Sequence, residues 1–173
     1  FGRTVWDVSE IGYGMWGMAG WTGSDDDETR RALQCAVDLG CNFFDTALAY
    51  GNGHSERLLA RVLPQHRARR LYVATKIPPK NGKWPAKPEY DIADVFPPEY
   101  VVEATETSLR NLGVERIDLQ QFHVWNDKWA AQSEWQEAVT TLKQQGKVRH
   151  FGISINDFEP ENGLAAAESG LID

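Results

Sequence analysis

The sequence has few cysteines and fewer basic than acidic residues. It contains two cysteines among 173 residues, Cys35 and Cys41, and their spacing matches no zinc-binding or redox pattern. The 18 basic and 25 acidic residues give a formal net charge of −7, which disfavours non-specific binding to nucleic acid or to an anionic membrane surface. The one basic cluster, residues 65–70, is interpreted as a solvated turn. We therefore expect no nucleic-acid partner.

Long apolar runs are also missing. No stretch approaches the roughly 20 apolar residues that cross a bilayer, and no secretory signal opens the sequence. A pair of thiols in a domain of this size is typical of a reducing compartment. These features predict a soluble cytoplasmic protein without a membrane partner.

The apolar residues that are present, 42% of the sequence, suffice for one domain with a sizeable core. Short apolar segments with strand character alternate with amphipathic helical patterns. The expected strands are residues 11–15, 42–47, 71–75, 116–122 and 148–154. This alternation predicts parallel βαβ units in a single α/β domain that spans residues 1–173. A small hairpin at about residues 1–10 is expected to precede the units.

Ionisable side chains follow three of the predicted strands. Asp45 ends one strand and Tyr50 lies in the next loop, while Lys76 and His123 end the two strands that follow. Each residue alone has an ordinary explanation, such as a turn cap for Asp45 or packing for Tyr50. Because the carboxyl ends of parallel strands meet at one rim, all four are expected to converge there, as in an active site.

The four residue types suggest proton transfer to a carbonyl group. An aspartate and a lysine at neighbouring strand ends neutralise each other, and a nearby ammonium lowers the pKa of a tyrosine by stabilising the phenolate. Tyr50 is then a usable general acid near neutral pH. His123 can donate a hydrogen bond to a substrate oxygen. Without a nucleophile or metal cluster, this set suits protonation of a carbonyl oxygen while hydride reaches the carbon.

One connection, residues 77–97, is long. It contains five prolines together with Trp84, Tyr90 and Phe96. A loop of this length is usually functional or disordered. It follows the carboxyl end of a predicted strand, where the loops of parallel α/β proteins meet their ligands.

The segments that carry these residues resemble the aldo-keto reductase superfamily. They read "GCNFFDTALAYGNGHSERLLARVL", "ATK", "LQQFH" and "GKVRHFGIS". The opening "GRT…VS" and the "YG…SE" after the tyrosine are similar to the branch that contains bacterial aldo-keto reductases and potassium-channel β subunits. The resemblance implies a (β/α)8 TIM barrel, of which this chain would hold the N-terminal two-thirds.

The resemblance also implies a role for each rim residue. Tyr50 would be the proton donor and Lys76 would lower its pKa. Asp45 would hold Lys76, and His123 would orient the carbonyl group. The reaction would be NAD(P)H-dependent reduction of an aldehyde or ketone, or oxidation of an alcohol or sugar in the reverse direction.

A cofactor, NADP(H), with NAD(H) as the alternative, is implied to lie across the rim. The stretch "GYGMWGMAG" matches the family's first-strand loop, which places Gly14, Met15 and Trp16 near the nicotinamide ribose. Asp45 and Ser154 are further implied contacts. Family members often read Ser-Asn where this chain reads "SIND". Ile155 therefore takes the second place and Asn156 follows one position later; Asn156 is assigned to the cofactor.

Tryptophans are expected to form the substrate pocket. Trp21, Trp84 and Trp125 lie at or beyond predicted strand ends, which suits a small carbonyl substrate with an apolar or sugar-like body. Two other functions remain open. One is a cofactor-binding regulatory subunit of the channel-β type, in which asparagine commonly replaces the histidine. The other is an inactive barrel fragment.

The length of the chain is short for such a barrel, which needs about 200 residues or more. The final "LID" resembles the start of another strand. Three interpretations follow: part of a longer chain, two associating half-barrels, or an inactive truncated product. In the first two, a missing C-terminal segment or self-association would cover the open sheet edge.

Overall fold

The computed structural model describes residues 1–20, 23–155 and 159–173. Its strands are β1 (Tyr13–Gly14), β2 (Phe43–Asp45), β3 (Tyr72–Ile77), β4 (Ile117–Phe122) and β5 (Val148–Ile153). Its α-helices are α1 (Asp26–Asp38), α2 (His54–Ala60), α3 (Ile92–Val95), α4 (Pro98–Leu112), α5 (Ser133–Gln144) and α6 (Leu164–Glu168). None of these helices has the length and apolar character needed to cross a bilayer.

The strands form one sheet in the order β1-β2-β3-β4-β5, with every neighbouring pair parallel. Asp45 pairs with Ala74, and Lys76 pairs with Gln121. This register brings the carboxyl ends of β2, β3 and β4 to the same edge. The predicted parallel α/β sheet, part of a (β/α)8 barrel, is confirmed.

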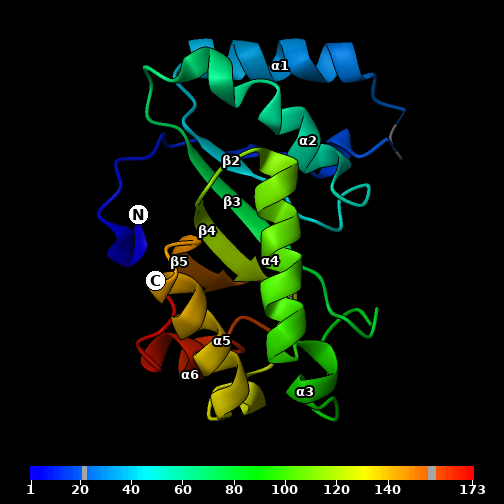
Figure 1. Cartoon of the computed structure of the whole chain (residues 1–173), viewed down its shortest axis with the longest axis vertical. Coiled ribbons are helices and arrows are strands. Elements are labelled where there is room, and N and C mark those ends of the chain that lie inside the picture. Colours follow the sequence, from blue (N-terminus) through cyan, green and yellow to red (C-terminus); the bar gives the residue numbers. More distant parts are fainter. Residues whose placement is uncertain (21–22, 156–158) are drawn as a thin grey trace.

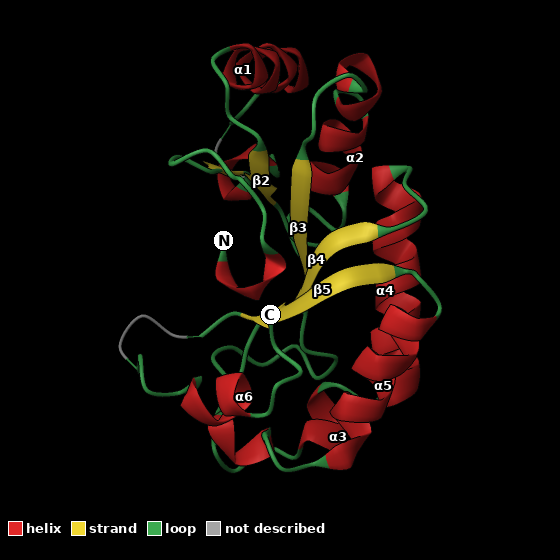
Figure 2. Ribbon diagram, turned by 90° about the vertical axis from the view of Figure 1, so that its left-hand side faces the viewer, coloured by secondary structure: helices red, strands yellow, loops and turns green. Residues whose placement is uncertain are grey.

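The longer helices cover one side of the sheet (Figure 1), and the first turn of the chain lies on the other side (Figure 2). Local chemistry sets where they begin and end. The Asp25 carboxylate caps α1 by accepting hydrogen bonds from Asp27 and Glu28. Pro98 opens α4, and Gly113 ends it in the left-handed conformation with φ 65°. Leu33 and Val37 of α1 and Val101 and Leu112 of α4 are buried toward the sheet.

The hairpin expected at about residues 1–10 is wrong. The segment contains a single 3-10 turn, Gly2–Thr4, and no described residue before Tyr13 belongs to a strand. Its backbone instead bonds to Asn42, whose amide donates to the Asp7 carbonyl and accepts from the Ser9 N–H. Trp6 stacks on Tyr72 with 4.6 Å between ring centroids. Contacts with the sheet replace pairing within the segment.

The final residues do not form a strand, but Asp173 lies beside β5. Its N–H donates to the Phe151 carbonyl at 2.9 Å, and its carboxylate accepts from the Phe151 N–H at 3.0 Å. Lys143 of α5 adds an ion pair to this carboxylate at 2.5 Å. The residues 171–173 therefore extend along β5 without completing a ladder.

The long connection 77–97 folds around the short helix α3. The Tyr100 hydroxyl donates to the Pro78 carbonyl at 3.0 Å, and the Trp129 indole donates to the Tyr90 carbonyl at 2.8 Å. Phe96 is buried and stacks on Phe122 at 4.3 Å between ring centroids. These contacts anchor the loop to the body of the domain.

Candidate active site

The rim of the sheet brings Asp45 and Lys76 into direct contact. Lys76, only 7% exposed, donates its ammonium to the Asp45 carboxylate and to the Thr46 carbonyl, the latter at 2.9 Å. A buried ammonium is costly unless a counter-charge and hydrogen bonds satisfy it. The carboxylate at the end of β2 thus compensates the lysine of β3.

Tyr50 and His123 face this pair. The Lys76 ammonium lies 5.2 Å from the centroid of the Tyr50 ring. The Tyr50 and His123 rings are 5.5 Å apart at 72°. The turn that presents Tyr50 needs Gly51, because a Cβ at this position would lie 2.9 Å from the Ala19 carbonyl and the backbone has φ 61°. The four side chains therefore converge from three strand ends.

The pKa of Tyr50 differs from the expectation. Burial, and then the negative charge of Asp45, raise the pKa of Tyr50 from 10.0 to about 12. The predicted lowering of this pKa is wrong because burial, the larger cause, and the charge of Asp45 both disfavour the phenolate. Tyr50 consequently keeps its proton at neutral pH.

The His123 imidazole is neutral. Burial, and then the Lys76 ammonium, lower the pKa of His123 from 6.5 to about 4. Its Nδ1 atom is buried and has no hydrogen-bond partner within the described part of the chain. The ring is held by aromatic contacts with Tyr50 and Trp84. A neutral imidazole has one N–H donor to offer to a ligand oxygen.

The shifted pKa of His123 predicts how stability depends on pH. Between pH 6.5, the ordinary value, and about 4, the folded value, the unfolded chain binds more protons at this group than the folded protein. Its contribution to stability is complete above pH 6.5 and is lost as the pH falls toward 4. The slope is at most about 1.4 kcal/mol per pH unit.

Urea unfolding of the wild type and of His123→Gln from neutral to mildly acidic pH measures this contribution. We expect a smaller loss of unfolding free energy with acidification in the variant. His66→Gln, on a partly exposed histidine far along the chain, is the matched control. Equal pH slopes for the wild type and His123→Gln would contradict the burial of a neutral imidazole.

A cavity of about 500 Å³ opens over this group and is lined by Trp16, Ala49, Tyr50, Trp84 and His123. The Trp84 ring meets His123 edge-to-face, with centroids 4.6 Å apart at 90°. Trp84 is 48% exposed although the loop that carries it is anchored. Ala49 is a lining residue that the sequence did not reveal, because nothing distinguishes an alanine in a loop.

The structure does not bring all the predicted pocket tryptophans together. Trp125 is 1% exposed and packs among Phe122, Trp129 and Trp135, so its assignment to the substrate pocket is corrected to the hydrophobic core. Trp21 lies outside the described residues. Of the two that the structure describes, Trp84 lines the cavity and Trp125 does not.

The predicted cofactor residues differ in how accessible they are to a ligand. A Cβ built on Gly14 meets no atom within 4 Å, so the rim is open there. Met15 is 0% exposed and its side chain belongs to the core. Its N–H donates to the Asp45 carbonyl at 2.9 Å and its carbonyl accepts from the Met18 N–H at 3.1 Å, so the predicted contact of Met15 with the cofactor is corrected to a buried structural position. Trp16 is 61% exposed. Ser154 follows β5, and its N–H donates to the Phe122 carbonyl at 2.8 Å. Asn156 lies outside the described residues.

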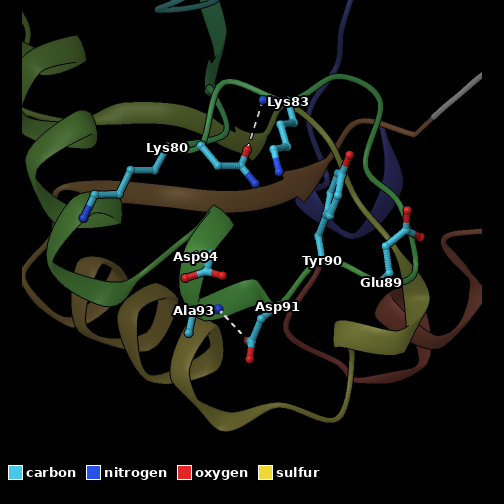
Figure 3. A pocket seen from close by; sticks show the side chains of 8 residues that line it. Lys80, Lys83, Glu89, Tyr90, Asp91, Ala93 and Asp94 are labelled. Carbon is cyan, nitrogen blue, oxygen red and sulfur yellow. Dashed lines mark hydrogen bonds between the residues drawn. The ribbon is translucent and has the colours of Figure 1, made fainter.

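A second cavity, of about 540 Å³, lies in the connection 77–97 and contains none of the four rim residues. Figure 3 shows its mixed lining, with Lys83 and Tyr90 on one side and Asp91 and Asp94 on the other. The Lys83 ammonium lies 5.0 Å from the centroid of the Tyr90 ring. Across the described residues, no three His, Cys, Asp or Glu side chains are grouped to hold a metal ion.

Comparison with protein families gives a match over most of the chain. The family model described as "Aldo/keto reductase family" matches residues 10–163. Aldo-keto reductase YhdN of Bacillus subtilis is 32% identical over 151 residues, which cover 86% of this chain and 44% of the relative. A putative voltage-gated potassium channel subunit beta of Schizosaccharomyces pombe is 30% identical over 163 residues, covering 88% of this chain and 43% of the relative.

A solved structure is consistent with this family match. The aldo-keto reductase from Klebsiella pneumoniae in complex with NADPH superposes with a TM-score of 0.71 at 26% identity, covering 93% of this chain and 50% of that chain. The chain spans about half the length of the relatives that it matches.

Proposed function

Because the chain belongs to the aldo/keto reductase family, we propose that it carries the proton-transfer site of an NAD(P)H-dependent enzyme that interconverts carbonyl compounds and alcohols. The observation that supports this proposal best is the buried Lys76–Asp45 pair beside Tyr50 and His123 at one cavity. The substrate would be a small aldehyde or ketone whose carbonyl oxygen enters between Tyr50 and His123.

The rim fits a nicotinamide cofactor. Gly14 leaves open space, Trp16 exposes an aromatic face, and the cavity next to them has room for a planar ring and a small carbonyl group. We assign the cofactor to Gly14, Trp16, Asp45 and Ser154. NADPH is favoured because the Klebsiella relative binds it, and NADH is the alternative.

In this proposal, the bound nicotinamide supplies hydride to the carbonyl carbon. The neutral His123 donates a hydrogen bond to the carbonyl oxygen and orients it. Tyr50, which is protonated at neutral pH, gives its proton to the oxygen as negative charge develops there. The Lys76 ammonium, 5.2 Å from the ring centroid, stabilises the phenolate that remains. Asp45 holds Lys76 in place, and Trp84 walls the cavity.

A second candidate function is a cofactor-binding regulatory subunit, since one relative is named as a channel β subunit. The presence of a neutral, cavity-facing His123 favours the enzyme. An inactive fragment is the third possibility. The location of the protein in the cytoplasm stays a prediction.

A panel of carbonyl compounds tests the enzyme directly. Aldoses, aliphatic aldehydes and quinones are offered with NADPH, and the loss of cofactor absorbance is followed. We expect turnover with at least one class. Quenching of tryptophan fluorescence by NADPH is measured in parallel. Quenching without any turnover would support the regulatory subunit. The absence of both quenching and turnover would contradict the proposal for this chain.

The outer strands β1 and β5 each have only one strand neighbour within the described part of the chain. We propose that a further barrel segment or a second copy covers these edges. Intact mass together with light scattering distinguishes these two partners: the first predicts a chain mass above 19.5 kDa, and the second predicts a dimer of chains that are 19.5 kDa each.

A further inference from the structure

The residues Ser55 and Glu56 at the start of α2 are fully buried, each 0% exposed, although both are polar. Burying a hydroxyl and a carboxylate is costly unless their hydrogen bonds are made inside the protein. The proposed mechanism gives neither side chain a task. Their partners therefore show what the burial achieves.

Ser55 connects the ends of two strands. Its hydroxyl is 2.8 Å from the Thr46 hydroxyl and donates to the Met15 carbonyl at 3.3 Å. Thr46 directly follows Asp45, and its own carbonyl accepts the Lys76 ammonium at 2.9 Å. Ser55 thus contacts Thr46, whose carbonyl is one of the two groups that bind the Lys76 ammonium.

Glu56 connects α2 to the third strand and to α4. One carboxylate oxygen accepts from the Thr75 hydroxyl at 2.6 Å, and the other accepts from the Asn111 amide at 2.8 Å. Thr75 directly precedes Lys76. No Lys, Arg or His nitrogen of the described chain lies within 4.0 Å of this carboxylate, so neutral donors alone hold it.

We propose that Ser55 and Glu56 form a clamp of positioning residues that holds Asp45 and Lys76 at the distance required by the site. The clamp forms hydrogen bonds with Thr46 and Thr75, which are the neighbours of Asp45 and Lys76 in the sequence. β2 has only three residues, so its own ladder constrains its end weakly. The effect of the clamp on turnover rests on the proposed function, whereas its effect on Lys76 does not.

Exchange of the Lys76 ammonium protons with water tests the clamp without any cofactor. In ¹⁵N-lysine NMR spectra, we expect a slowly exchanging signal, assigned by its loss in Lys76→Met, because this ammonium is 7% exposed and bonded to Asp45 and Thr46. Ser55→Ala should accelerate its exchange several-fold. Thr46→Ser, which keeps the hydroxyl, should retain the slow exchange.

Ser108→Ala is the matched control. Ser108 is also 0% exposed, lies in α4, and its hydroxyl has no hydrogen-bond partner among the described residues. Melting temperatures are recorded for every variant, so that a loss of fold is separated from a loosened lysine. Slow exchange in Ser55→Ala, or equal acceleration in Ser108→Ala, would overturn the clamp.

Turnover supplies the second measurement. Ser55→Ala should reduce kcat by roughly tenfold or more with little change in KM. Misplacing a catalytic group by a fraction of an ångström reduces the stabilisation of the transition state more than it reduces substrate binding. Ser108→Ala should leave both constants unchanged. If no variant and no wild type turns over, the proposed function fails, while the exchange experiment still decides the clamp.

Discussion

Replacing Tyr50 with phenylalanine is expected to lower turnover by roughly 10²- to 10⁴-fold, the usual contribution of a positioned general acid. The hydroxyl is the only group removed, so the cavity walls and the Lys76–Asp45 pair should remain. The affinity for NADPH, followed by tryptophan fluorescence, should change little. Steady-state kinetics with the best substrate of the carbonyl panel measures the effect.

Tyr100→Phe is a matched control, because Tyr100 is a partly buried tyrosine of α4 whose hydroxyl bonds to Pro78 in the long connection. It should keep most of the turnover. If Tyr50→Phe retains wild-type kcat, Tyr50 does not transfer the proton. If it loses NADPH binding as well, the tyrosine acts in holding the cofactor and the assigned role is wrong.

Trp125→Ala is expected to destabilise the fold by about 3–5 kcal/mol, as is typical for truncation of a large buried aromatic residue. Trp125 is 1% exposed, its ring lies 5.2 Å from that of Trp135, and its indole N–H donates to Asp127 at 2.8 Å. The variant loses dispersion contacts and leaves a cavity in the core. Urea unfolding followed by circular dichroism measures the loss.

Trp84→Ala should behave in the opposite way, because this side chain is 48% exposed and lines the candidate active-site cavity. We expect a change in unfolding free energy within about 1 kcal/mol and an altered KM for carbonyl substrates. A large stability loss in Trp84→Ala together with a small loss in Trp125→Ala would reverse the assignment of the two tryptophans.

Much of the candidate site was predictable because it follows strand ends. The residues Asp45, Lys76 and His123 each terminate a recognisable apolar segment, and parallel pairing has to bring such positions together. The tryptophans were less predictable. Trp84 and Trp125 both follow strands, and only packing decided that one faces a cavity and the other fills the core.

The pKa of Tyr50 was mispredicted for a related reason. The residue types alone place a positive and a negative charge near the phenol, and the net effect depends on distances and burial. In the folded protein, burial and then the charge of Asp45 raise the pKa to about 12. The clamp of Ser55 and Glu56 was equally hidden, since a Ser-Glu pair at a helix start is ordinary in sequence.

Sequence patterns by themselves determined the parallel α/β architecture, the family and the four rim residues, because these depend on local periodicity and on the order of motifs along the chain. The tertiary structure decided which polar groups compensate each other, which aromatic rings reach the cavity, and where the first ten residues pack. Those outcomes depend on contacts between residues distant in sequence, as between Glu56 and Asn111 or Trp6 and Tyr72, which no local pattern encodes.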